Sequence, residues 1–301
     1  MYYIILRTPP DIYNSEYTAH LIEHLELAVQ ADISEYFNIQ QYDGTSYSYY
    51  STYTIDTTDR EKVNIFIEKL ILPIQSTYLT REKKRIREEL ADPDYSKKIV
   101  EAVGKIWYGE TYRYARPTRS SLTEIQSYHS QYYTRENISV YTKSNIITTD
   151  IYDPGLNTIS RGEFRVGHNR NIFLYTDLSS ISICVFFLLE KLFDSYLDYL
   201  DVLSGKYWAR YTVQGEHPEK VWISYKTSDR DDLASIPDDF IRTFVIDTLE
   251  NSEKDSENNI PEHDLVSLLH FGSALSKTVK TTIIGNIDSY YQQIRTHMLS
   301  K

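Results

Sequence analysis

The segment 20–24, His-Leu-Ile-Glu-His, constrains this chain more than any other. It lies in the stretch 14–30, where the spacing of apolar residues predicts an amphipathic helix. Two histidines four positions apart project from one face of a helix, because a turn takes about 3.6 residues. Glu23 shares the face of His20 and His24, from which a carboxylate can reach a water on the same ion. The segment indicates a metal site, and a surface helix carrying these residues by coincidence is the alternative.

A second charged segment offers a third ligand, which a catalytic zinc site with one open position requires. Residues 80–91, Thr-Arg-Glu-Lys-Lys-Arg-Ile-Arg-Glu-Glu-Leu-Ala, are strong helix formers without Gly or Pro. Glu82 and Glu89 are seven residues apart, about two turns, so they lie on one side next to the apolar Ile86. Glu88 points away, and we therefore predict Glu89 as the ligand. A charged helix with salt bridges along its surface is the alternative.

Together the two segments resemble the pitrilysin/insulinase family of zinc peptidases, which includes the mitochondrial processing peptidases. In that family a His-x-x-Glu-His helix is followed by a helix of the form Glu-Arg/Lys-x-x-Val/Ile-x-x-Glu-Leu/Ile, and the second segment fits this form at every position. The resemblance implies Zn²⁺ as cofactor, His20, His24 and Glu89 as its ligands, Glu23 as the catalytic base and Glu82 as an auxiliary carboxylate. It implies a zinc endopeptidase that hydrolyses small or unfolded peptides in an enclosed chamber.

Substrate-binding residues follow from the same resemblance. The stretch 44–56 is β-branched and aromatic with small polar residues interleaved, which predicts one strand with a solvated face. In the family the corresponding strand offers its edge to an extended peptide, which implies Thr45 and Ser46 as substrate contacts. The family's second domain grips the peptide with an arginine and a tyrosine. Tyr207 matches the tyrosine, whereas Leu200 stands at the arginine position. The contact of the missing arginine is therefore expected from another residue of this chain or from a partner chain.

The order of predicted elements is that of an α+β protein. We predict strands at 3–8, 137–143, 163–166, 171–175, 179–188, 206–214 and 220–227, and helices at 33–37, 59–72, 94–108, 121–133, 236–249, 261–276 and 284–299, with another from the end of the strand at 188 to about 203. A linker at 150–157 separates a zinc-binding catalytic domain, 1–149, from a second domain, 158–301, that clamps the substrate. The resemblance implies two related α/β-sandwich domains of the pitrilysin-like fold.

The composition of the chain limits the classes of partner that it can bind. A net charge of −11 argues against nucleic acid and against an anionic membrane, because both select basic surfaces. No stretch is long enough to span a bilayer and the N-terminus lacks a signal peptide, so we expect a cytoplasmic protein. Cys184, the one cysteine, lies in an apolar run and is predicted to be a core thiol. The six histidines outside the motif lack ligand-like spacing and are predicted at the surface or at helix caps.

The expected partners are a peptide substrate and a second subunit. Because the chain has the length of one half of a peptidase chamber and Leu200 replaces the clamp arginine, the family resemblance predicts a homodimer or a heterodimer with a related subunit. A non-catalytic or partner-dependent subunit of a heterodimeric processing peptidase is the alternative function.

Overall fold

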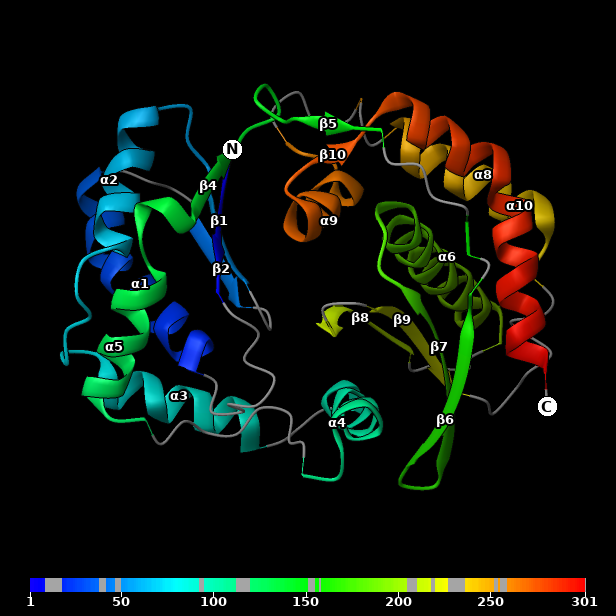
Figure 1. The fold of residues 1–301 in the computed structure, drawn as a ribbon, viewed down its shortest axis with the longest axis horizontal. Coiled ribbons are helices and arrows are strands. Elements are labelled where there is room, and N and C mark those ends of the chain that lie inside the picture. The colour runs from blue at the N-terminus through cyan, green and yellow to red at the C-terminus, as the bar shows by residue number, and fades with distance from the viewer. Residues whose placement is uncertain are drawn as a thin grey trace. The chain divides into compact units, whose positions relative to one another are not determined.

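The structure is a computed structural model that describes residues 1–8, 18–37, 42–46, 50–91, 95–111, 120–150, 155–156, 158–204, 210–217, 220–226, 236–251, 254 and 259–300. The chain divides into two compact units. The first comprises residues 1–97 and 108–145, and the second comprises residues 98–107 and 146–301. Each unit contains a four-stranded antiparallel sheet with packed helices, which agrees with the predicted mixture of helix and sheet (Figure 1).

The first unit has a sheet with strand order β2-β3-β1-β4, in which every neighbouring pair is antiparallel. Its elements are β1 (Tyr2–Arg7), α1 (Thr18–Phe37), β2 (Tyr42–Ser46), β3 (Tyr50–Ile55), α2 (Arg60–Leu70), α3 (Leu79–Ala91), α5 (Leu122–Tyr132), a 3-10 turn (Arg135–Asn137) and β4 (Ile138–Tyr141). Helices α1, α2 and α5 lie on one face of this sheet (Figure 1). The central strand β1 supplies Ile4 and Leu6 to two apolar clusters beneath these helices.

Local capping explains where two of these helices begin. Asp59 accepts a hydrogen bond from the backbone N–H of Glu61 and starts α2. Ser121 and Glu124 form the predicted capping box at the start of α5, each side chain accepting from the other residue's backbone N–H. These side chains satisfy N–H groups that the first helical turn leaves without partners.

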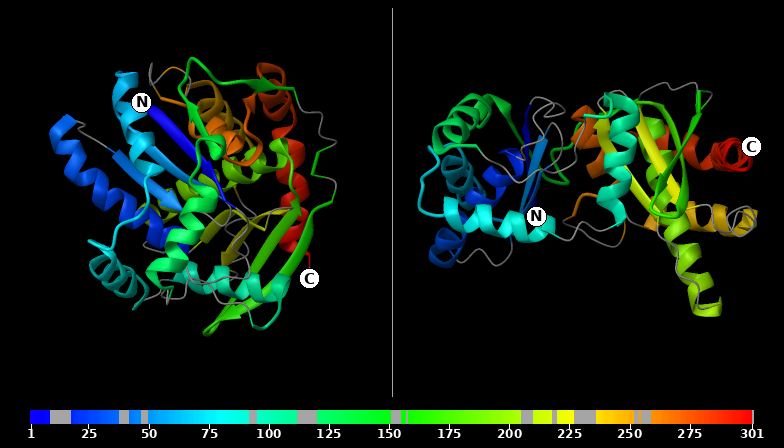
Figure 2. Two further views of the ribbon diagram at one scale, coloured as in Figure 1. Left: turned by 60° about the vertical axis from the view of Figure 1, so that its left-hand side comes forward. Right: turned by 90° about the horizontal axis from the view of Figure 1, so that it is seen from below.

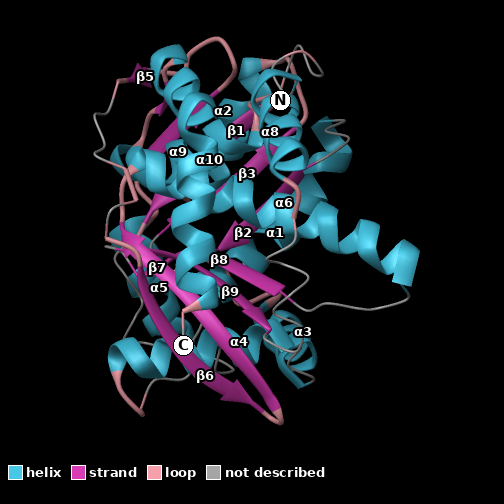
Figure 3. Cartoon of the chain, turned by 90° about the vertical axis from the view of Figure 1, so that its right-hand side faces the viewer, coloured by secondary structure: helices cyan, strands magenta, loops and turns pink. Residues whose placement is uncertain are grey.

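The second unit has a sheet with strand order β6-β7-β9-β8, also antiparallel throughout, whose strands lie side by side in Figure 3. Its elements are β5 (Thr148–Thr149), β6 (Ser160–Val166), β7 (Asn169–Asp177), α6 (Ser180–Ser204), β8 (Arg210–His217), β9 (Lys220–Lys226), α8 (Asp238–Ile246), a π-helical turn (Asp247–Asn251), α9 (Glu262–Phe271), β10 (Ala274–Leu275) and α10 (Lys277–Leu299). Strands β5 and β10 form a separate parallel pair. Cys184 lies in the apolar core of this unit and is fully buried, as predicted.

Helix α4 (Tyr95–Tyr108) belongs mainly to the second unit, although the sequence prediction leaves it in the first. Its Trp107 meets Phe173, Tyr175 and Trp222 edge-on, with ring centroids 5.7–6.1 Å apart. The residues that alternate with these aromatic residues along β7 and β9 belong to the apolar core that includes α6 and α10. Because alternate residues of a strand point to opposite faces of the sheet, α4 covers the face that is turned away from this core. Figure 2 shows α4, in blue-green, lying along the yellow strands. The assignment of 1–149 and 158–301 as catalytic and clamp domains stays a prediction.

Four predicted elements differ from the structure in type or in bounds. The apolar run 179–188 is the start of the helix α6 and not a strand, because residues 181–189 are all buried and a helix buried all round shows no amphipathic period. Residues 33–37 continue α1, and α10 begins at Lys277, where the side chain of Ser276 caps it. The stretch 44–56 forms parts of two paired strands, β2 and β3, in place of one.

Among the helices that the structure describes, none is both long enough and apolar enough to cross a lipid bilayer.

Candidate metal centre

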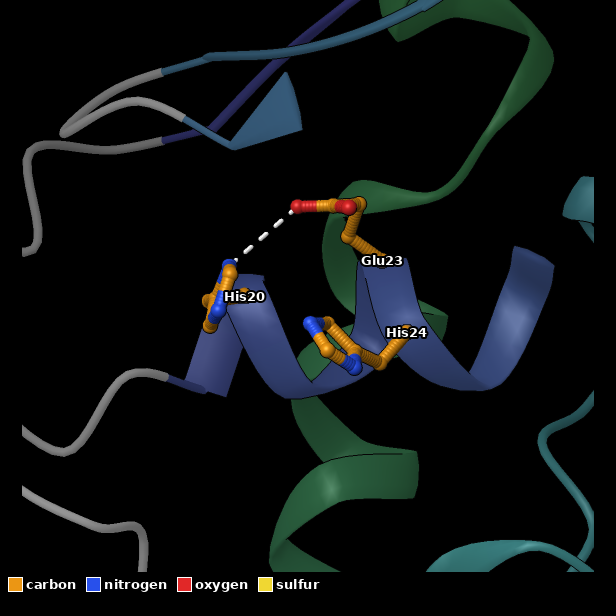
Figure 4. Close-up of side chains that lie close together, drawn as sticks. All are labelled: His20, Glu23 and His24. Atoms are coloured by element: carbon orange, nitrogen blue, oxygen red, sulfur yellow. Dashed lines mark hydrogen bonds and ion pairs between the residues drawn. The ribbon is translucent and has the colours of Figure 1, made fainter. Parts of the chain in front are cut away.

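Helix α1 places its two histidines and Glu23 at one site. Leu21 and Ile22 are fully buried in the core of the first unit, and this packing fixes the rotation of the helix. The rings of His20 and His24 meet edge-on with centroids 4.6 Å apart. One potential ligand atom from each of His20, Glu23 and His24 lies within 4.8 Å of the others (Figure 4).

Helix α3 brings Glu89 to the same histidines. Its Ile86 packs in the apolar cluster that holds α1, and this contact sets the side of α3 that faces α1. The Oε2 atom of Glu89 lies 3.3 Å from Nε2 of His20 and 3.6 Å from Nε2 of His24. Glu88 instead pairs with Lys84 on the exposed side of α3, at 3.6 Å. The structure thus brings together the three residues predicted as ligands.

Two of the distances among these atoms suit a zinc ion. Zinc–nitrogen and zinc–oxygen bonds of about 2.0–2.1 Å in tetrahedral geometry put neighbouring ligand atoms about 3.3–3.4 Å apart. The separations of Glu89 Oε2 from the two histidine nitrogens, 3.3 and 3.6 Å, are close to that value. Two imidazole nitrogens and one carboxylate oxygen are also a donor set that catalytic zinc takes.

The other ring nitrogens of both histidines have polar partners. Nδ1 of His24 lies 3.3 Å from Oε2 of Glu82, whose side chain is fully buried. Nδ1 of His20 lies 3.0 Å from Oγ of Ser46 and 3.3 Å from Oε2 of Glu23. A hydrogen on Nδ1 leaves the lone pair on Nε2, the atom that faces Glu89 in each ring.

Glu23 approaches His20 from the Nδ1 side, whereas Glu89 approaches the same ring from the Nε2 side. In Figure 4 the carboxylate of Glu23 points toward His20 and away from His24. Its side chain is 6% exposed. In this conformation Glu23 is a hydrogen-bond partner of His20, and its role as a base stays a prediction.

The residues predicted to bind substrate have separate locations. Strand β2 stands at the end of the sheet order, so one of its edges has no strand partner among the described residues. Thr45 is exposed on β2, and its carbonyl accepts a hydrogen bond from Oγ1 of Thr52 at 3.5 Å. The side chain of Ser46, by contrast, is engaged with His20. Tyr207 lies outside the described residues.

A buried polar pair that joins α1 to α5 was not predicted from the sequence. Glu26 on α1 and His129 on α5 are 3% and 2% exposed, with Nε2 of His129 3.1 Å from Oε1 of Glu26. The same nitrogen lies 2.8 Å from the carbonyl of Leu70, so it carries the hydrogen and donates to both oxygens. Burial raises the pKa of Glu26 to about 7, against the opposing hydrogen bond and charge of His129.

The expectation of a surface position is therefore wrong for His129, and also for His263, which is 1% exposed. A signal was present for His129, because it follows the buried Ile125 by four residues and shares its face of α5. Likewise Glu26 follows the buried Ile22 by four residues and shares its face of α1. Polar residues at core positions predict buried pairs of this kind.

No protein-family model matches the chain. No curated protein sequence matches it either. Among solved structures, the chain is similar to pitrilysin, with a TM-score of 0.47 and 11% identity over 99% of this chain and 40% of the pitrilysin chain. It is also similar to a predicted insulinase family protease from Yersinia pestis, with a TM-score of 0.48 and 10% identity over 99% of this chain and 84% of that chain. The chain thus spans less than half the length of the pitrilysin chain it resembles.

Proposed function

We propose that the chain is a zinc-dependent endopeptidase whose metal is held by His20, His24 and Glu89. One observation carries this proposal: the Nε2 atoms of both histidines face a single carboxylate oxygen at 3.3 and 3.6 Å. Both Nδ1 atoms are meanwhile occupied by partners on other elements. If the two histidines were on one face of α1 by coincidence, a carboxylate from a second helix would not be expected to face both of their Nε2 atoms.

Each residue then has a defined task. A zinc ion in this site supplies Lewis acidity, which polarises a peptide carbonyl and acidifies water. Glu23, after turning from His20, accepts the proton of the attacking water and passes it to the nitrogen that leaves when the peptide C–N bond breaks. The edge of β2 that has no strand partner among the described residues offers main-chain hydrogen bonds to an extended peptide, and Thr45 lies on this strand. Recognition through the main chain suits unfolded peptides of varied sequence.

The test combines metal analysis with a peptidase assay on the full chain. The parent protein should bind one zinc, and Glu23→Gln should keep the metal and the fold while losing about a hundredfold to ten-thousandfold in hydrolysis, because Gln cannot accept the proton. Glu88→Gln on the exposed side of α3 is the matched control and should hydrolyse at the parental rate. Equal hydrolysis by parent and Glu23→Gln would refute Glu23 as the base.

We further propose that the active form is a dimer, with a second copy or a related subunit. Leu200 stands where the resemblance expects the clamp arginine, so a partner chain would supply the missing substrate contact. An enclosed site also excludes water and orients the peptide, which a single open half cannot do. Light scattering at the concentration of the assay tests the proposal. A strictly monomeric species with full activity would exclude it.

A further inference from the structure

Two arginines hold the buried carboxylate of Glu82. Oε1 of Glu82 accepts a hydrogen bond from Nε of Arg81 at 2.6 Å, and Oε2 accepts one from Nη1 of Arg85 at 3.2 Å. The Glu82 side chain is fully buried, while those of Arg81 and Arg85 are 56% and 58% exposed. Arg81 is itself fixed by the ring of Tyr78, whose centroid lies 4.5 Å from its Cζ atom. A buried carboxylate requires such pairing, because its charge loses the solvation of water.

The position of Glu82 determines which nitrogen of His24 bears hydrogen. The Oε2 atom that receives Arg85 also lies 3.3 Å from Nδ1 of His24. An acceptor at Nδ1 selects the ring form with hydrogen on that atom, so Nε2 keeps its lone pair. Nε2 is the atom that faces Glu89.

We infer that Arg81 and Arg85 are positioning residues for the metal-binding form of His24 and act through Glu82. This inference rests on the proposed zinc site, although neither arginine contacts the predicted ligands. The sign of the effect separates positioning from simple charge. Two positive groups near a cation site repel the cation, so removing them should tighten zinc binding if charge alone mattered. Positioning predicts weaker binding.

The experiment measures zinc affinity of the full chain by competition with a chelating dye. Arg81→Ala combined with Arg85→Ala should lose about 10- to 100-fold in affinity, the usual effect of removing support behind a ligand. Lys84→Ala combined with Arg87→Ala removes the same charge from exposed positions of α3 and is the matched control, for which affinity should stay the same or rise slightly. Circular dichroism verifies that all variants fold.

A double-mutant cycle tests the route through Glu82. In the Glu82→Gln protein, the two arginine substitutions should cause no further loss, because the group through which they act is already changed. An equal loss with and without Glu82→Gln would overturn the inference. So would an affinity of the double arginine variant that equals or exceeds the control.

A second measurement needs no metal. In the metal-free protein, ¹⁵N NMR of the neutral imidazole should show hydrogen on Nδ1 of His24, and the double arginine variant should lose this preference. If the parent protein binds no zinc, the proposed function fails, while the NMR comparison still decides the role of the arginines. An unchanged ring form in the variant would overturn that role.

Discussion

Glu26 should make the stability of the first unit fall as pH rises. Its carboxyl is 3% exposed and is bonded at 3.1 Å to His129. Burial raises its pKa from an ordinary 4.5 to about 7, and unfolding returns it to the ordinary value. Between these two pH values the folded state binds more protons than the unfolded chain, so stability decreases with increasing pH. The decrease starts near pH 4.5 and is complete above pH 7.

The size of the effect follows from the two pKa values. They differ by about 2.5, and one pKa unit corresponds to about 1.4 kcal/mol. The carboxylate therefore lowers the free energy of unfolding by about 3 kcal/mol at pH 8, relative to a group that cannot ionise. Glu26→Gln is such a group, and its amide oxygen can still accept from His129. The variant should be about 3 kcal/mol more stable than the parent at pH 8 and nearly equal to it at pH 4.5.

The assay is urea unfolding across this pH range, with EDTA present so that metal binding does not contribute. The three tryptophans of the chain, Trp107, Trp208 and Trp222, all belong to the second unit, so their fluorescence follows that unit, whereas far-ultraviolet circular dichroism follows both. The stabilisation should appear in the dichroism transition of the first unit. Glu88→Gln, at a side chain 64% exposed, should change stability by less than about 0.5 kcal/mol at any pH. A stability difference between parent and Glu26→Gln that does not change with pH, or a less stable variant at pH 8, would contradict this prediction.

Two further predictions concern the second unit. Cys184 is fully buried and burial raises its pKa to about 12, so a thiol reagent should modify it only after unfolding; rapid labelling of the native protein would contradict this. Trp107→Ala removes three edge-on aromatic contacts, each worth about 0.5–1.5 kcal/mol, and should destabilise the second unit by about 2–4 kcal/mol. The fluorescence of the two remaining tryptophans, Trp208 and Trp222, reports that transition. An unchanged midpoint would exclude α4 as a cover of the sheet.

The sequence predicted well where local chemistry decides the structure. Helical spacing brought His20 and His24 to one face, and Glu89 was distinguished from Glu88 by its place beside Ile86. The Ser121 capping box likewise depends only on neighbouring residues. In these cases the geometry of a single helix determines which side chains share a face and where the helix begins.

Prediction failed where the answer depends on residues distant in sequence. The run 181–189 is buried on every side, so its own pattern cannot distinguish a helix from a strand. One signal was available at its start, the spacing of Ser179 and Ser182. In the structure each of these side chains accepts a hydrogen bond from the other residue's backbone N–H, at 3.1 and 2.9 Å, as at the start of a helix. Two Nδ1 partners, Glu82 of His24 and Ser46 of His20, come from α3 and β2, and no spacing within α1 indicates them.

Helix α4 also has a consequence for any attempt to divide the protein. Residues 98–107 interrupt the first unit yet cover the aromatic face of the second sheet, so a fragment that starts at 146 leaves Phe173, Tyr175 and Trp222 without this cover. Such a fragment should aggregate, because a sheet face of large aromatic groups is then open to water. During synthesis α4 leaves the ribosome before the strands that it covers, so it can pack on the sheet only after β9 has been made. A synthetic peptide of residues 95–108 added to the fragment should restore its solubility, as complementation between two pieces of one fold.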